Sequence, residues 1–112
     1  MSQITTHILD TSIGKPAAGV VVSLLRKENE SWTQISNGKT NADGRITDLL
    51  KADIILDKGI YKLVFETKSY FRKNNIQTFY PGISIEFEIA DASHYHVPLL
   101  LNPFGYSTYR GS

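Results

Sequence analysis

The feature that most constrains the fold is an alternation of apolar and polar residues with a period of two. It is clearest in ISIEFEI (residues 83–89) and in YKLVFET (residues 61–67). Successive side chains of a strand point to opposite faces, so this alternation predicts strands that are buried on one side. A third run, VVVSLLRK (residues 20–27), is mostly apolar and β-branched. That composition is typical of a strand covered on both faces or lying at an interface.

Turn signals separate these runs. Asp43-Gly44 in NADGR provides a position for positive φ, and Pro16 and Pro81-Gly82 interrupt the chain elsewhere. Several short strands with this punctuation predict an all-β fold, a two-sheet antiparallel β-sandwich. The stretch from Thr67 to Asn75 differs, and we expect it to form one short helix with Thr67 or Ser69 as its N-cap.

Length and composition limit the classes of function. The chain has 112 residues, which predicts a single domain over residues 1–112, and its formal net charge of +1 argues against nucleic acid as a partner. It has no cysteine, so a disulfide framework, a thiolate nucleophile and a cysteine zinc site are excluded. No apolar run approaches the ~18 residues of a membrane helix. The start, MSQITTHILD, lacks a secretory pattern, and we therefore expect a cytoplasmic location.

The three histidines are the first candidates for chemistry. His94 and His96 lie two residues apart in HYHVPLLL, so in a strand both side chains point to one face, while His7 lies in a separate predicted strand. Pro98 restricts the HYHVPLLL strand to an edge position or to an irregularity. Histidine is the usual proton shuttle near neutral pH, although surface or structural histidines are the commoner case. Zinc held by three imidazoles is a further alternative, but the spacing and the lack of an acidic cluster argue against it.

Arg45, directly after the Asp43-Gly44 turn, is the second candidate. Such an arginine is most often a solvated charge, but its forked donors also match a carbonyl, a carboxylate or a developing oxyanion. The chain has neither a Gly-x-Ser-x-Gly nucleophile elbow nor a Gly-rich phosphate loop. Covalent catalysis and phosphate binding are therefore disfavoured.

Three stretches resemble the 5-hydroxyisourate hydrolase branch of the transthyretin-like family: THILDTSIGKPAAGV, TNADGRI and HYHVPLLLNPFGYSTYRGS. The last is highly specific, and Asn102, where the family often has Ser, is a small departure. The resemblance implies a β-sandwich of transthyretin type that assembles into a homotetramer. Its pockets would lie at the dimer–dimer interface in a central channel, and no metal or organic cofactor would be needed.

The resemblance also implies an activity, the hydrolysis of 5-hydroxyisourate in urate catabolism. This small-molecule substrate would be opened in its six-membered ring at an amide bond, giving 2-oxo-4-hydroxy-4-carboxy-5-ureidoimidazoline. Water would be activated by histidine and the oxyanion stabilised by arginine, with His94 ranked below His96. The implied catalytic residues are His7, Arg45 and His96, and the implied substrate contacts are His7, Arg45, Tyr109 and Ser112.

Two other functions fit the same fold. A carrier of hydrophobic, hormone-like ligands would lack the histidine–arginine set and the YRGS ending, both of which are present in this chain. A generic β-sandwich interaction module would be a monomer in which the histidines are incidental.

Overall fold

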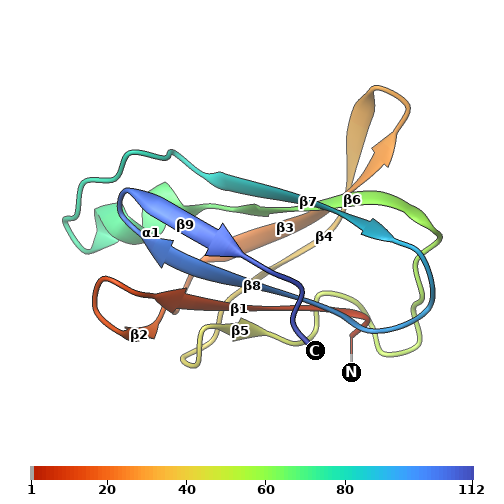
Figure 1. Cartoon of the computed structure of the whole chain (residues 1–112), viewed down its shortest axis with the longest axis horizontal. Coiled ribbons are helices and arrows are strands. Elements are labelled where there is room, and N and C mark those ends of the chain that lie inside the picture. Colours follow the sequence, from red (N-terminus) through yellow and green to blue (C-terminus); the bar gives the residue numbers. More distant parts are fainter. Residues whose placement is uncertain (1) are drawn as a thin grey trace.

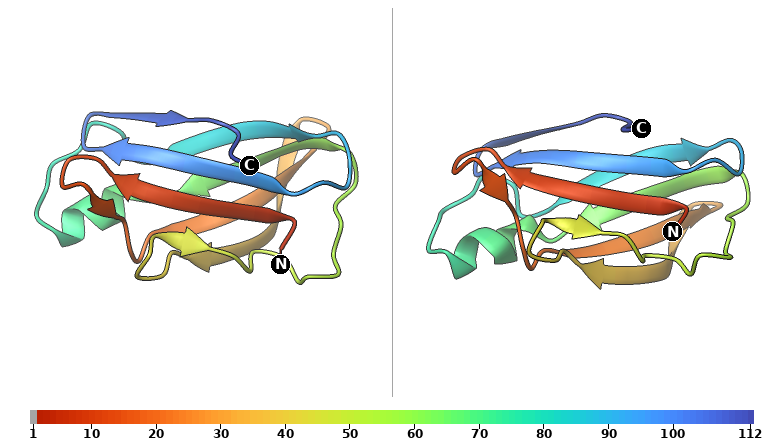
Figure 2. Two further views of the ribbon diagram at one scale, coloured as in Figure 1. Left: turned by 60° about the horizontal axis from the view of Figure 1, so that its bottom comes forward. Right: turned by 90° about the horizontal axis from the view of Figure 1, so that it is seen from below.

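The computed structural model describes residues 2–112, which form two β-sheets packed face to face with one short helix at one end (Figures 1 and 2). The first sheet has the order β2-β1-β8-β9, and β5 also pairs with β1. The second sheet has the order β4-β3-β6-β7. The strands of the first sheet are β1 (Ile4–Asp10), β2 (Lys15–Pro16), β5 (Arg45–Ile46), β8 (Tyr95–Asn102) and β9 (Gly105–Thr108); those of the second are β3 (Val21–Glu28), β4 (Ser31–Lys39), β6 (Gly59–Phe65) and β7 (Ile83–Ile89). The predicted all-β sandwich is confirmed.

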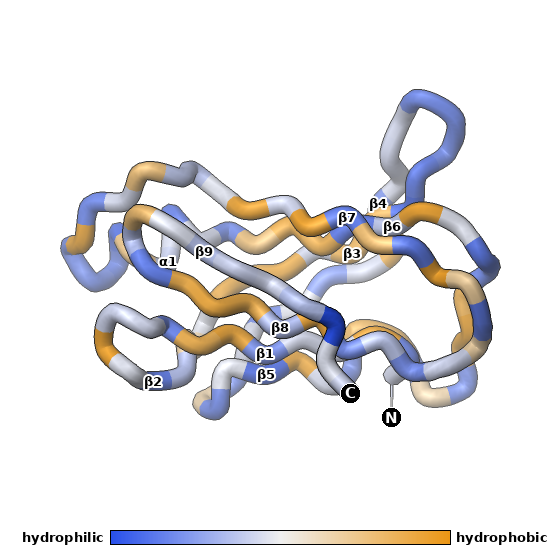
Figure 3. The backbone as a smooth tube through the Cα atoms, in the orientation of Figure 1, coloured by the Kyte–Doolittle hydropathy of each residue, from blue (hydrophilic) through white to orange (hydrophobic). Residues whose placement is uncertain are grey.

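The core lies between the sheets, where the period of two predicts it. On β6 the side chains of Tyr61, Leu63 and Phe65 are at most 1% exposed, and on β7 Ile83 and Ile89 are buried as well. Fully burying one such side chain stabilises the fold by ~1.5–3 kcal/mol. Figure 3 shows the corresponding pattern, with hydrophobic positions along the paired strands and hydrophilic residues at the β3–β4 hairpin.

Strand β3 is fully buried on one face only within a single chain. Val22 and Leu24 are fully buried, whereas Val21, Ser23 and Leu25 on the other face are half-buried. The strand is central in its sheet, and within one chain only its inner face meets the opposite sheet. Within one chain the strand is therefore fully covered on one face only, and the alternative that its other face lies at an interface stays a prediction.

Helix α1 (Thr67–Lys73) follows β6 as predicted, but its cap is different. The N-cap residue is Glu66, no side chain makes a capping hydrogen bond, and Thr67 is buried in the protein. The Tyr70 hydroxyl donates to Oδ2 of Asp10 on β1 at 2.8 Å, and burial together with this contact raises the pKa of Tyr70 to about 12. Packing therefore fixes this helix.

Within residues 2–112 no helix is long and apolar enough to cross a membrane.

Strands β1 and β8 run parallel, and every other strand pair within residues 2–112 is antiparallel. Their register is continuous over seven residue pairs, from Ile4 with Tyr95 to Asp10 with Leu101. Strand β1 thus lies in the middle of the first sheet beside a strand whose residues are 91 positions later in the sequence, as Tyr95 is from Ile4. Figure 1 shows β1 and β8 side by side, with the C-terminal segment turning back toward the start of β1.

Pro98 lies in the central strand β8, so the edge position expected for it is wrong and the irregularity is what the structure contains. The pairing of β8 with β9 stops at Leu99 with Thr108, and the two segments meet again at an isolated bridge between His96 and Gly111. Proline has no N–H for the ladder. Its carbonyl accepts a hydrogen bond from the Thr108 hydroxyl at 2.7 Å instead.

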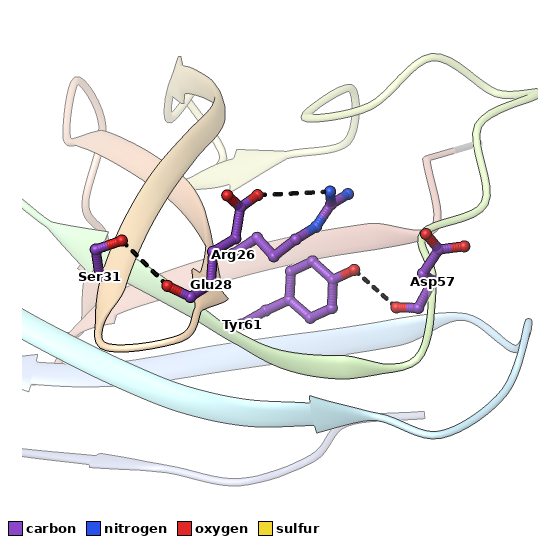
Figure 4. Close-up of polar contacts among 5 residues, drawn as sticks. All are labelled: Arg26, Glu28, Ser31, Asp57 and Tyr61. Atoms are coloured by element: carbon purple, nitrogen blue, oxygen red, sulfur yellow. Dashed lines mark hydrogen bonds and ion pairs between the residues drawn. The ribbon is translucent and has the colours of Figure 1, made fainter.

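Separate polar contacts hold the β3–β4 hairpin and the start of β6 (Figure 4). The Ser31 hydroxyl donates to the carbonyl of Glu28 at 3.1 Å, and Arg26 lies 3.9 Å from the Glu28 carboxylate. The Tyr61 hydroxyl donates to the carbonyl of Asp57 at 2.7 Å. These contacts fasten the hairpin that projects from the sandwich in Figure 1, and they contain none of the candidate site residues.

Candidate active site

Strand register brings the predicted site residues to the outer face of the first sheet. His7 on β1 pairs with Arg45 on β5, and Thr5 on β1 pairs with His96 on β8. Alternate residues of a strand share a face, so Thr5 and His7 point away from the core that contains Ile4 and its alternate neighbours. Three segments distant in sequence therefore meet across β5, β1 and β8.

The turn before Arg45 fixes where that residue lies. Gly44 has φ of +72°, and a Cβ there would lie 2.5 Å from the carbonyl oxygen of Ile8. Oδ1 of Asn41 accepts hydrogen bonds from the backbone N–H groups of Asp43 at 2.9 Å and Arg45 at 3.0 Å. Glycine is thus required by conformation and by space. The sequence identifies this turn through Asp-Gly, but it does not reveal that the Asn41 side chain organises it.

A threonine hydroxyl joins two of the histidines. Oγ1 of Thr5 lies 2.8 Å from Nε2 of His94 and 2.8 Å from Nδ1 of His96. The two rings are nearly parallel, with centroids 6.3 Å apart and an interplanar angle of 23°. The shared face predicted for His94 and His96 is confirmed. Thr5 was not predicted as a site residue. Its only signal in the sequence is that it lies two residues before His7, so that in a strand the two side chains share a face.

The C-terminal segment packs directly on the His96 ring. The N–H of Gly111 donates to the carbonyl of His96 at 2.9 Å, and a Cβ at residue 111 would lie 2.5 Å from Cδ2 of that ring. Nδ1 of His96 is engaged by Thr5, and Nε2 makes no hydrogen bond within residues 2–112. One nitrogen of a fixed ring is therefore free for a ligand.

A cavity of about 200 Å³ lies at this place. It brings together Arg45, His96 and Ser112, which are three of the predicted site positions. His7 does not line it; on β1 it lies two residues beyond Thr5, which pairs with His96. The full lining consists of Thr5, Thr6, Arg45, Thr47, His94, His96 and Ser112.

Tyr109 lies apart from this cluster. It is 59% exposed and lines a different cavity of about 340 Å³, together with Ile85 and Phe87 on β7. Its neighbour Arg110 stacks on the Tyr95 ring, with 4.2 Å from Cζ to the ring centroid. Within one chain the structure therefore does not bring Tyr109 to the histidines. Strand β9 ends at Thr108, so the tail lies beyond the last strand.

The environment favours the neutral form of two histidines. Burial lowers the pKa of His96 below its usual value, and the nearby Arg45 charge lowers it further, followed by His94 and His7. Burial also lowers the pKa of His7, again with Arg45 as the second cause. Both imidazoles therefore remain neutral, and able to accept a proton, at pH values where an ordinary histidine begins to be charged.

The zinc alternative finds no support in this arrangement. Across residues 2–112, no three His, Asp or Glu side chains lie close enough to one another to hold a metal ion. The nitrogens of His94 and His96 that face each other are both occupied by the Thr5 hydroxyl.

Comparison with known proteins identifies the family of this chain. The model of the HIUase/Transthyretin family matches residues 4–111. The chain belongs to this family. The family resemblance expected from the sequence is confirmed, and the matched range includes Thr5, Arg45, His94 and His96.

Members of the HIUase/Transthyretin family with a hydrolase name are the more similar relatives in sequence. A probable 5-hydroxyisourate hydrolase of Caenorhabditis elegans is 45% identical over 112 residues, covering 99% of this chain and 82% of the relative. The 5-hydroxyisourate hydrolase of Salmonella typhi is 47% identical over 110 residues, covering 97% and 80%.

Solved structures of the family agree with the fold. The 5-hydroxyisourate hydrolase of Klebsiella pneumoniae has a TM-score of 0.86 at 41% identity, covering 97% of this chain and 92% of its own. Sea bream transthyretin in complex with thyroxine has a TM-score of 0.91 at 31% identity, covering 98% and 95%. The backbone is thus common to both branches, whereas the sequence is more similar to the hydrolases.

Proposed function

We propose that this chain is a 5-hydroxyisourate hydrolase, and that His7, Arg45 and His96 perform the reaction. The observation that carries the proposal is the meeting of Arg45 and two histidines on one sheet face, with both histidine pKa values lowered. The hydrolase names of relatives 45–47% identical to this chain support the same substrate.

The proposed reaction begins with the removal of a proton from water by an imidazole. The oxygen of that water bonds to the amide carbonyl carbon of the six-membered ring, the C–N bond breaks, and the ring nitrogen receives a proton. The product is 2-oxo-4-hydroxy-4-carboxy-5-ureidoimidazoline. A positioned general base contributes ~10²–10⁴-fold, and a neutral imidazole at pH 7 suits this role. His7 and His96 share the base and acid roles, and no metal or organic cofactor enters the reaction.

Arg45 has the second proposed role. As water adds, negative charge develops on the carbonyl oxygen, and a fixed guanidinium stabilises that charge more than it stabilises the ground state. The turn built by Asn41 and Gly44 holds the Arg45 backbone, so little reorganisation accompanies the reaction. Arg45 also keeps the histidine pKa values low, which preserves the base.

The remaining substrate contacts are proposed to come from a neighbouring subunit. A cavity of about 200 Å³ is smaller than the ~300 Å³ at which most ligand pockets begin. Tyr109 is exposed and lies outside this cavity within its own chain. A homotetramer would complete the pocket where two subunits meet, with Tyr109 of the neighbouring subunit and Ser112 of the same chain among its substrate contacts.

The direct test is an assay with 5-hydroxyisourate made in place by enzymatic oxidation of urate. Its ultraviolet absorbance decays spontaneously, and we expect the protein to accelerate this decay. His96→Asn should lower kcat by ~10²-fold or more while leaving the thermal unfolding midpoint close to that of the parent. Absence of acceleration by the parent protein would contradict the proposed function.

The carrier alternative is tested in the same samples. Titration with an iodinated aromatic ligand should show weak binding compared with a carrier. Tight binding without turnover would favour the carrier instead.

A further inference from the structure

The Thr5 hydroxyl lies between the rings of His94 and His96, and the proposed mechanism gives it no role. We propose that these three side chains form a proton relay, in which Thr5 and His94 hold His96 in its active tautomer and carry charge from His96 to His94, the more exposed of the two rings that line the cavity. This inference rests on the proposed function, because it assigns a role to neighbours of the proposed base. Thr5 and His94 are positioning residues here, since they act through His96.

The hydrogen-bond count of the hydroxyl restricts the tautomers. A threonine hydroxyl donates one hydrogen bond and accepts others, whereas each neutral imidazole has one N–H and one lone pair. With both ring nitrogens at 2.8 Å from Oγ1, Thr5 donates to one ring and accepts from the other. The tautomers of His94 and His96 are therefore coupled: when one presents its N–H to Thr5, the other presents its lone pair.

One of these two hydrogen-bond arrangements leaves His96 able to act as a base. If Nδ1–H of His96 donates to Thr5 and the Thr5 hydroxyl donates to Nε2 of His94, then Nε2 of His96 has a free lone pair. This is the nitrogen that makes no hydrogen bond within residues 2–112, on a ring that lines the cavity. In the opposite order Nε2 of His96 carries a proton and cannot accept another.

The same chain of groups moves charge after the proton is taken. When Nε2 of His96 accepts a proton from water, its Nδ1 proton passes to Oγ1 of Thr5, and the Thr5 proton passes to Nε2 of His94. The positive charge moves from a half-buried ring to an exposed one. No atom is left over: one proton enters at His96 and one arrives at His94, which can release its Nδ1 proton to solvent.

Electrostatics favours this direction. A charged His96 would lie near the Arg45 guanidinium, which already lowers the pKa of His96, and in a partly buried position. His94 is at the outer end of the pair, although the Arg110 guanidinium lies 3.3 Å from its carbonyl. Moving the charge outward by one ring separates it from Arg45.

A matched pair of variants at Thr5 tests the relay. Thr5→Val keeps the shape of the buried side chain and removes the hydroxyl, whereas Thr5→Ser keeps the hydroxyl. We expect Thr5→Val to lower kcat at least ~10-fold at little changed KM, since a histidine in the wrong tautomer costs up to ~10⁴-fold in Ser-His-Asp hydrolases. Thr5→Ser should restore most of this loss. Equal turnover of Thr5→Val and the parent would overturn the proposal.

Nitrogen NMR of histidine-labelled protein reads the tautomers without any substrate. The parent and Thr5→Ser should show His96 protonated at Nδ1 and His94 unprotonated at Nε2, whereas Thr5→Val should show mixed tautomers. A parent spectrum with His96 protonated at Nε2 would overturn the relay even if the enzyme is active. Conversely, absence of turnover with the expected spectrum would contradict the proposed function and leave the hydrogen-bond order intact.

His94→Gln separates the positioning of His96 from the movement of charge. The glutamine amide oxygen can accept from Thr5 but cannot take up its proton. We expect the His96 tautomer to stay as in the parent while kcat falls at least several-fold. An unchanged kcat would show that the proton does not travel beyond Thr5, and the relay as proposed would be wrong.

Discussion

At the scale of single residues, Gly111 shows how a backbone position can control a side chain 15 positions away in sequence. Its N–H donates to the carbonyl of His96, and its Cα packs so closely that a Cβ would lie 2.5 Å from Cδ2 of the ring. The backbone of the tail therefore approaches His96 as closely as only a glycine allows.

Gly111→Ala should therefore impair turnover while sparing the fold. The methyl group must displace either the His96 ring or the tail, and a small misplacement of a catalytic group costs up to ~10²-fold. The measurement is kcat together with the thermal unfolding midpoint. Gly105→Ala is the control, because its Cβ would meet atoms of Asn102 at an ordinary 3.7 Å. Equal losses in the two variants would show that the contact with His96 is not responsible.

We expect Arg45 to affect how kcat/KM depends on pH. Because its charge lowers the pKa of both His7 and His96, removing the charge raises these values, and the bases become protonated at a higher pH. Arg45→Gln should move the acid limb of kcat/KM toward higher pH, in addition to lowering the maximum. Arg45→Lys should keep the limb closer to that of the parent. A limb that moves toward lower pH in Arg45→Gln would contradict this account.

At the scale of elements, helix α1 is held by packing and not by its cap. The expected caps, Thr67 and Ser69, make no capping hydrogen bond. The Thr67 side chain is 1% exposed, and its hydroxyl has no hydrogen-bond partner within residues 2–112. A threonine at the start of a helix usually caps it, but here the Thr67 side chain is buried and makes no capping hydrogen bond.

Thr67→Val should stabilise the protein. Burying a hydroxyl without a partner costs ~1–3 kcal/mol, and valine has the same shape without that group, so we expect the free energy of unfolding to rise by about 1 kcal/mol. Urea denaturation measures this change. Thr33→Val at an exposed position of β4 is the control and should change stability by less than ~0.5 kcal/mol. A loss of stability in Thr67→Val would show that the hydroxyl is satisfied.

At the scale of the whole molecule, sequence patterns predict elements better than their pairing. The alternation in residues 83–89 and the pair His94 and His96 fix which side chains share a face, and both are found as expected. Nothing in that pattern states that β1 pairs with β8 or in which direction. Thr5 therefore could not be placed beside His96, because their proximity depends on the register of strands about 90 residues apart.

Tyr109 marks the other limit of prediction from one chain. Its position in YRGS resembles a substrate contact, but within its own chain it lies in a cavity between β7 and the tail. Residues that act across a subunit boundary cannot be placed by the fold of a single subunit. Asn41 is a third case, since an asparagine before Asp-Gly is common and its two backbone contacts appear only in the folded turn.

Dilution should therefore separate the fold from the site. If neighbouring subunits complete the pocket, turnover per chain should fall when the protein is diluted below its dissociation range, while far-ultraviolet circular dichroism changes little. Specific activity measured alongside light scattering tests this. A monomer with full turnover would contradict the proposed assembly.

The parallel pairing of β1 with β8 has a consequence for how the protein is made. During synthesis β1 leaves the ribosome before β8, and each residue of β1 waits for a partner 91 positions later, as Ile4 does for Tyr95. Until then the nascent chain exposes an apolar strand without its partner, a situation in which chaperones engage and aggregation begins. The Thr5–His96 contact accordingly cannot form early, and a ribosome stalled before residue 95 would carry a chain without the proposed site.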